Sequence, residues 1–127
     1  MKSEKFPLDQ FGQLISERLR DSALGRFDKL CQGQQKAPGL QHLQSSVAGL
    51  SGASRAIARR CLVSAIDGAI HDFLFTLHEG TYNDAAIAFL LAGQDVNQLG
   101  DGLHGEPFGT GGWFARFSAF GAPPEEA

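Results

Sequence analysis

The chain has 127 residues, the size of one ordinary domain, and 43% of them are hydrophobic, which is enough for a buried core. The charged fraction of 20% is too low for a disordered chain. The formal net charge of −3 argues against a nucleic-acid-binding protein, because such a protein needs a basic surface for the phosphates.

The N-terminus carries lysines but no apolar h-region, so it does not read as a secretory signal. The longest apolar run, residues 85–92, is too short to span a bilayer. Cys31 and Cys61 lie far apart within helical patterns and are expected to be two buried thiols. We therefore expect a cytoplasmic protein without membrane contact, folded as a single domain over residues 1–127 with a frayed tail at 121–127.

Residues 9–31 predict an amphipathic helix, with Gly25 as a point where it could break late. Its apolar column recurs every four residues at Phe11, Ile15, Leu19, Ala23 and Phe27. A polar loop ending in Pro38-Gly39 follows, and then a short helix is expected over residues 40–50.

The strongest helical pattern covers Ser54–Glu79 and predicts one continuous helix at the centre of the fold, with Gly80 as its stop. One apolar column contains Ile57, Cys61, Ala65, Ala69, Phe73 and Leu77. A second column beside it contains Leu62, Ile66, Ile70 and Leu74. Both columns are expected to face the core.

Residues 81–84 resemble a turn, and residues 85–91 favour strand over helix. Residues 92–94 would then turn a short hairpin into 95–99. A short terminal helix is expected after a Thr110 cap, with Trp113, Phe114, Phe117 and Phe120 on its inner side. The predicted fold class is mainly α, with α+β as the alternative: a long central helix, a short β-hairpin and a glycine-rich C-terminal loop.

The segment Gly100–Gly105 matches the dinucleotide motif G-x-G-x-x-G by letter. Glu106-Pro107 follows where a helix should begin, and too few residues remain for a βαβ unit. No cofactor is therefore expected. The simplest interpretation of the glycines is a series of tight turns.

Polar side chains in two places could converge if the glycine loop folds over the central helix. Asp67 and His71 are four residues apart on the helix, and the loop adds His104 and Glu106. These four are the candidate catalytic or metal-binding residues, and the simpler alternative is a surface pair on the helix with a histidine that anchors the loop. No metal is assigned to them.

Phe75 falls on the polar side of the same helix, where an aromatic side chain is typical of a contact with another protein. We therefore expect a binding surface that combines this side of the helix with the loop. Its predicted members are Phe75, His78, Asp101, His104, Glu106 and Trp113.

Two segments, "AIDGAIHDFLFTLHE" (65–79) and "DGLHGEPFGTGGWFARFS" (101–118), resemble a group of small bacterial proteins of uncharacterised function. The shared pattern is D-G-L-x-G-E followed by G-W-x-x-x-F-S, and it covers less than half of the chain. These proteins are similar to the immunity and accessory proteins encoded beside bacterial toxins. The resemblance implies no catalytic residue.

Three possibilities remain open at this point. The first is a non-enzymatic protein-binding domain, of the immunity type that binds and neutralises a partner toxin. The alternative is a small enzyme or metal-binding protein that uses the Asp/His/Glu cluster. A homo-oligomer that associates through the phenylalanine-rich C-terminus is a third possibility.

Overall fold

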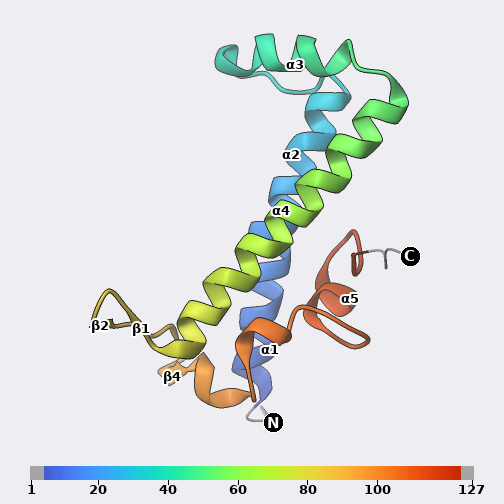
Figure 1. The fold of residues 1–127 in the computed structure, drawn as a ribbon. Helices are drawn as coiled ribbons and strands as arrows, with labels where there is room; N and C mark the ends of the chain where they lie inside the picture. The colour runs from blue at the N-terminus through green and yellow to red at the C-terminus, as the bar shows by residue number, and fades with distance from the viewer. Residues whose placement is uncertain (1–4, 124–127) are drawn as a thin grey trace.

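The computed structural model describes residues 5–123 and shows a long helical hairpin. Its first arm is a continuous helical rod of α1 (Lys5–Leu14), the π-helical segment η1 (Ile15–Asp21) and α2 (Ser22–Cys31). The short helix α3 (Gln41–Ala48) crosses the far end, after a 3-10 turn at Pro38–Leu40. The second arm is α4 (Gly52–Glu79), which runs back beside the first (Figure 1). The fold is mainly α, as the sequence predicts.

The π-helical segment changes which side of the first arm faces the core. A π-helix accommodates one extra residue per turn relative to an α-helix, so the side chains that follow are rotated. Beyond Ile15 and Ser16, the buried positions of this arm are therefore Arg20 and Leu24, and Leu19 is 46% exposed. The predicted column through Leu19 is wrong for this reason. The predicted break at Gly25 is also absent, since α2 continues to Cys31.

The central helix is continuous, as predicted, and it passes through Gly68 without a break. Ser51 caps its N-terminus, because the Ser51 side chain accepts a hydrogen bond from the Ser54 backbone N–H. Gly80 ends it in the left-handed conformation, with φ of 79° and a hydrogen bond from its N–H to the Thr76 carbonyl.

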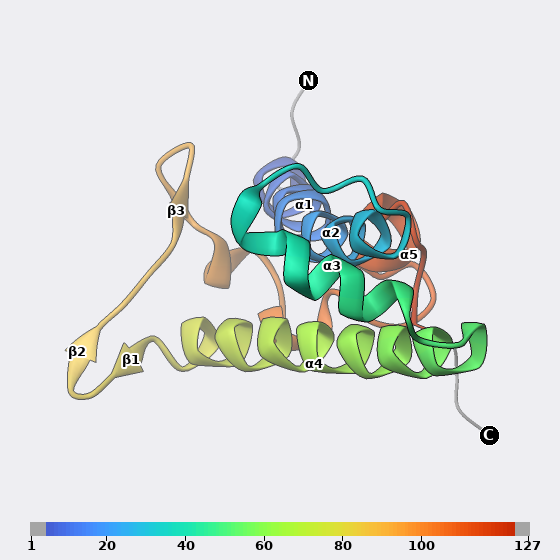
Figure 2. The ribbon, with the colours of Figure 1, turned by 90° about the horizontal axis from the view of Figure 1, so that it is seen from above.

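Two small antiparallel hairpins follow, where the sequence predicts one. Strand β1 (Thr81–Tyr82) pairs with β2 (Ala85–Ala86), and β3 (Leu90–Leu91) pairs with β4 (Gln94–Asp95). Both turns have two residues with positive φ, at 83–84 and 92–93, which is the geometry of tight hairpin turns. The expected strand at 85–91 is therefore two short strands, and 96–99 is a 3-10 turn. In Figure 2 the hairpins project on the side of the molecule away from α5.

The C-terminal segment contributes two 3-10 turns, η3 (Val96–Leu99) and η4 (Leu103–Gly105), and the short helix α5 (Trp113–Phe117). This segment covers one side of the helical hairpin formed by the two arms, in its lower half in Figure 1. The residue before α5 is Gly112 and no side chain caps the helix, so the predicted Thr110 cap is wrong. Phe120 is 41% exposed and does not lie on an inner side.

The main core lies where α1, the C-terminal half of α4 and the C-terminal segment meet. Its buried members are Leu8, Phe11, Ile15, Ile70, Leu74, Leu77, Val96, Leu103, Trp113 and Phe114. One half of the prediction for α4 is thus confirmed, because Ile70 and Leu74 come from its second apolar column. The other column is exposed at every position from Ile57 to Phe73, and only Leu77 is buried. Cys61 belongs to this column, so it is an exposed thiol and not a buried one.

Candidate functional site

Three histidines and a phenylalanine meet where η4 packs against the polar side of α4. The helix supplies His71, Phe75 and His78, each about one turn from the next, and the turn supplies His104. The ring centroid of His104 lies 5.5 Å from that of His71, 5.1 Å from that of Phe75 and 5.1 Å from that of His78. The predicted approach of the glycine loop to the helix is therefore present in the structure.

Hydrogen bonds orient two of these histidine rings. Nδ1 of His71 lies 3.3 Å from Oδ1 of Asp72, and Nδ1 of His78 lies 3.3 Å from Oδ1 of Asn97. Asn97 also donates from Nδ2 to the backbone carbonyl of His78, which fixes η3 against the end of α4. Nδ1 of His104 is buried and has no hydrogen-bond partner within residues 5–123.

An acidic hollow adjoins the histidine cluster on the side of the glycine loop. Asp101, His104 and Glu106 line it together with residues 110–112, and its volume is about 460 Å³. Asp101 and Glu106 also border a second hollow of about 550 Å³, toward Asp9. A Cβ atom on Gly100 would lie 2.8 Å from Oε1 of Glu106, so this glycine leaves room for the carboxylate. Among the described residues, the side-chain carboxylates of Asp101 and Glu106 have no hydrogen bond or ion pair.

Asp67 does not join the cluster, although the sequence analysis places it there. It is buried and forms a bidentate ion pair with Arg20, with Nε to Oδ1 at 2.8 Å and Nη2 to Oδ2 at 3.1 Å. The predicted contact between Asp67 and His71 is therefore wrong. Its physical reason is the π-helical segment, which turns Arg20 inward so that a buried cation faces this carboxylate.

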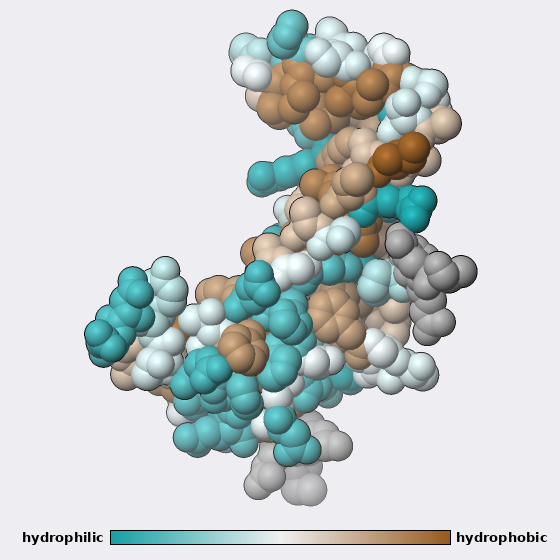
Figure 3. All heavy atoms as spheres, in the orientation of Figure 1, coloured by the Kyte–Doolittle hydropathy of each residue, from teal (hydrophilic) through white to brown (hydrophobic). Residues whose placement is uncertain are grey.

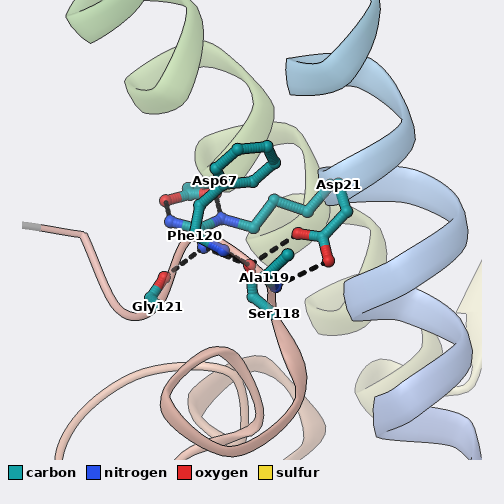
Figure 4. A network of polar contacts seen from close by, with 7 residues as sticks. Asp21, Asp67, Ser118, Ala119, Phe120 and Gly121 are labelled. Carbon is teal, nitrogen blue, oxygen red and sulfur yellow. Dashed lines mark hydrogen bonds and ion pairs between the residues drawn. The ribbon is translucent and has the colours of Figure 1, made fainter.

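Arg20 also fastens the end of the C-terminal segment (Figure 4). Its Nη1 donates to Oγ of Ser118 at 3.0 Å and to the carbonyl of Gly121. The guanidinium lies over the Phe114 ring, 4.1 Å from the centroid. Gly121, predicted as the first residue of a frayed tail, is thus bonded to the first arm, while residues 124–127 of that tail lie outside the described range.

The neighbouring Asp21 binds the same segment from the other side. Its Oδ1 accepts from the Ser118 hydroxyl at 2.6 Å, and its Oδ2 accepts from the Ala119 backbone N–H at 2.8 Å. Arg20, Asp21 and Ser118 were not singled out from the sequence. No local motif marks them, because their partners lie 47 to 101 residues away along the chain.

Trp113 is fully buried, so its predicted place on a binding surface is wrong. It packs edge-on against Phe11 with 5.7 Å between ring centroids. Its indole also lies against Gly12, where a Cβ atom would come within 2.5 Å of the ring. Trp113 is an anchor that holds the loop on the first arm, and the contact surface must come from the other predicted residues.

No group of three or more His, Cys, Asp or Glu side chains within residues 5–123 is placed to hold a metal ion. The diversion of Asp67 to Arg20 removes one of the four residues that the sequence analysis proposed for such a group. Glu106 lines the acidic hollow beside His104.

Comparisons with known proteins give no relative: no family model matches the sequence, and no significant match was found among curated proteins or solved structures. Within residues 5–123, no helix combines the length and the apolar character that a membrane span requires.

Proposed function

We propose that this chain is a non-enzymatic protein-binding domain, and that the histidine cluster and the acidic hollow form its contact surface. The observation that carries the proposal is the lack of a partner for the Asp101 and Glu106 carboxylates among the described residues. Both carboxylates lie in a hollow beside an exposed aromatic side chain, and neither is paired with another described residue.

The chemistry of this surface favours a partner segment with a basic side chain next to an apolar one. A lysine or arginine in the hollow would pair with Asp101 and Glu106. Phe75 is 42% exposed and would pack against the apolar neighbour, with His78 and His104 beside it. The surface over the lower end of α4 in Figure 3 is mostly hydrophilic with isolated apolar groups. In many protein interfaces apolar groups lie at the centre and polar groups surround them as a rim.

In its more specific form, the proposal is that the chain is an immunity-type protein, which binds and neutralises a partner toxin. A net charge of −3 suits a basic partner. The location that goes with it is the cytoplasm.

A random-peptide display library, selected on the immobilised protein, tests the proposal without knowledge of the natural partner. We expect enriched peptides that contain lysine or arginine beside an apolar residue. Their affinity for Glu106→Gln and Phe75→Ser should fall at least tenfold, about 1.4 kcal/mol. Glu17→Gln is the matched control, because Glu17 is an exposed acid on the first arm. Enriched peptides that bind all four proteins equally would contradict the proposal.

A further inference from the structure

One face of α4 is apolar and uncovered. The exposed column of the central helix consists of Ile57, Cys61, Ala65, Ala69 and Phe73. Ile57 is 59% exposed and Phe73 is 48% exposed. Phe73 and Phe75 are two residues apart, about 200° around an α-helix, so Phe73 lies on the side of α4 away from Phe75.

The column is a ridge with a groove on each side. Its members are four residues apart, which is the spacing of the commonest ridges in helix packing. A groove of about 510 Å³ runs beside Ile57, Cys61 and Ala65, and Arg60 and Ser64 line its polar edge. Another of about 220 Å³ lies between the arms, bordered by Leu19, Ile66, Ala69, Ile70 and Phe73.

The sizes of the side chains along the ridge fit a second copy of the same ridge. The three central residues are small, and the large residues, Ile57 and Phe73, stand eight positions before and after Ala65. Two helices that cross at about 50° approach most closely at one point and diverge on both sides of it. Small side chains belong at the crossing and large ones where the gap widens. A twofold axis at Ala65 places the small residues of both copies at the crossing and the large residues of both copies on either side of it. A symmetric dimer requires that the same surface of each copy fits the other.

The exposed area of the single chain agrees with a missing partner. The chain exposes 8245 Å². A folded monomer of 13.6 kDa exposes about 6,600 Å², so the excess is about 1,600 Å². A standard interface covers about 800 Å² on each partner. The excess is therefore large enough to supply such an interface.

We infer that the protein is a symmetric homodimer in which the α4 helices of two copies cross at Ala65. The inference is independent of the proposed function, because no residue of the column belongs to the proposed contact surface. It replaces the expected association through the C-terminal aromatic residues, of which Trp113 and Phe114 are buried within the chain.

Sedimentation equilibrium of the full chain tests the inference. We expect a mass of twice 13.6 kDa for the natural sequence. Ala65→Arg and Ala65→Glu should each be monomeric, since like charges would meet at the twofold axis. An equimolar mixture of the two variants should recover the dimer through opposite charges. The control Leu90→Arg, at a position 63% exposed in β3, should remain dimeric.

Ala65 is exposed, so the variants should fold, and circular dichroism checks this. A natural chain that sediments at 13.6 kDa up to about 100 μM, or single variants that remain dimeric, would overturn the inference. A natural dimer whose mixed variants stay monomeric would also overturn it, because the axis would then lie elsewhere.

Discussion

The lower half of the helical hairpin in Figure 1 has three layers: the first arm, α4 and the C-terminal segment. At the far end, α2, α3 and the start of α4 pack against one another and no further layer of described residues covers them (Figure 1). The three-layered half holds a core of ten buried apolar residues. The far half adds two, Leu24 and Val47, and apolar atoms remain visible over α3 and the upper part of α4 (Figure 3). The difference indicates that the half of the helical hairpin covered by the C-terminal segment is more stable than the far half.

The largest expected effect is the loss of the anchor of this third layer. Trp113→Ala should lower the free energy of unfolding by about 3–5 kcal/mol, because it removes a fully buried aromatic side chain from the core. Urea denaturation measures the change. Phe120→Ala, at an exposed position of the same segment, should cost less than about 1 kcal/mol. Equal losses for the two variants would show that the third layer does not carry the core.

The buried ion pair that joins the two arms, Arg20 with Asp67, should be nearly as sensitive to substitution. Asp67→Ala leaves the Arg20 cation buried and uncompensated, which should cost about 3–5 kcal/mol. The double variant Arg20→Met/Asp67→Leu should recover most of this loss, because it removes both buried charges. Thermal unfolding of the three proteins compares them. A double variant as unstable as Asp67→Ala would mean that the other Arg20 bonds, to Ser118 and Gly121, dominate.

The far half should respond weakly to the loss of its own ion pair. Arg59 donates to Asp28 from Nε at 2.9 Å and from Nη2 at 3.2 Å, and both side chains are about one third exposed. Asp28→Ala should therefore cost about 1 kcal/mol or less in urea denaturation. A cost equal to that of Asp67→Ala would contradict the contrast between the halves.

The same pair has a defined pH dependence. The hydrogen bonding of Arg59 to the Asp28 carboxylate, which accepts from the guanidinium, raises the pKa of the Arg59 guanidinium above its ordinary value. A raised folded-state pKa contributes stability in full below the unfolded-state pKa, and the contribution is lost only as the pH rises through the folded-state value. Both values are strongly alkaline, so the cost of Asp28→Ala should be the same at about pH 7 and about pH 9. If the cost of Asp28→Ala vanished at the higher pH, the cost would not come from the ion pair with Arg59.

The sequence predicts the elements better than it predicts their faces. Local signals such as the Gly80 stop and the apolar period of the central helix are sufficient for helix positions. The inward face of the first arm depends on the π-helical segment, from which Arg20 reaches Asp67, and no local pattern in the sequence reveals that segment. The approach of His104 to His71 was predictable from the glycine loop, but the burial of Trp113 follows from its contact with Gly12, about 100 residues earlier.

An apolar column in a sequence does not show what covers it. Ile57, Ala65 and Phe73 have the pattern of a core face, and within one chain they remain exposed. Periodicity reports only that a face is apolar, and the layer that buries it can belong to the same chain or to another copy. That distinction requires the positions of all elements.

Native-state hydrogen exchange tests the contrast between the halves most directly, because it reports the local free energy of opening for each backbone amide. We predict that amides of residues 70–77 in α4 and of residues 11–15 in the first arm exchange only through global unfolding. Amides of α3 (Gln41–Ala48) should exchange through openings at least about 2 kcal/mol lower in free energy. Equal protection across α3 and the lower part of α4 would contradict the account.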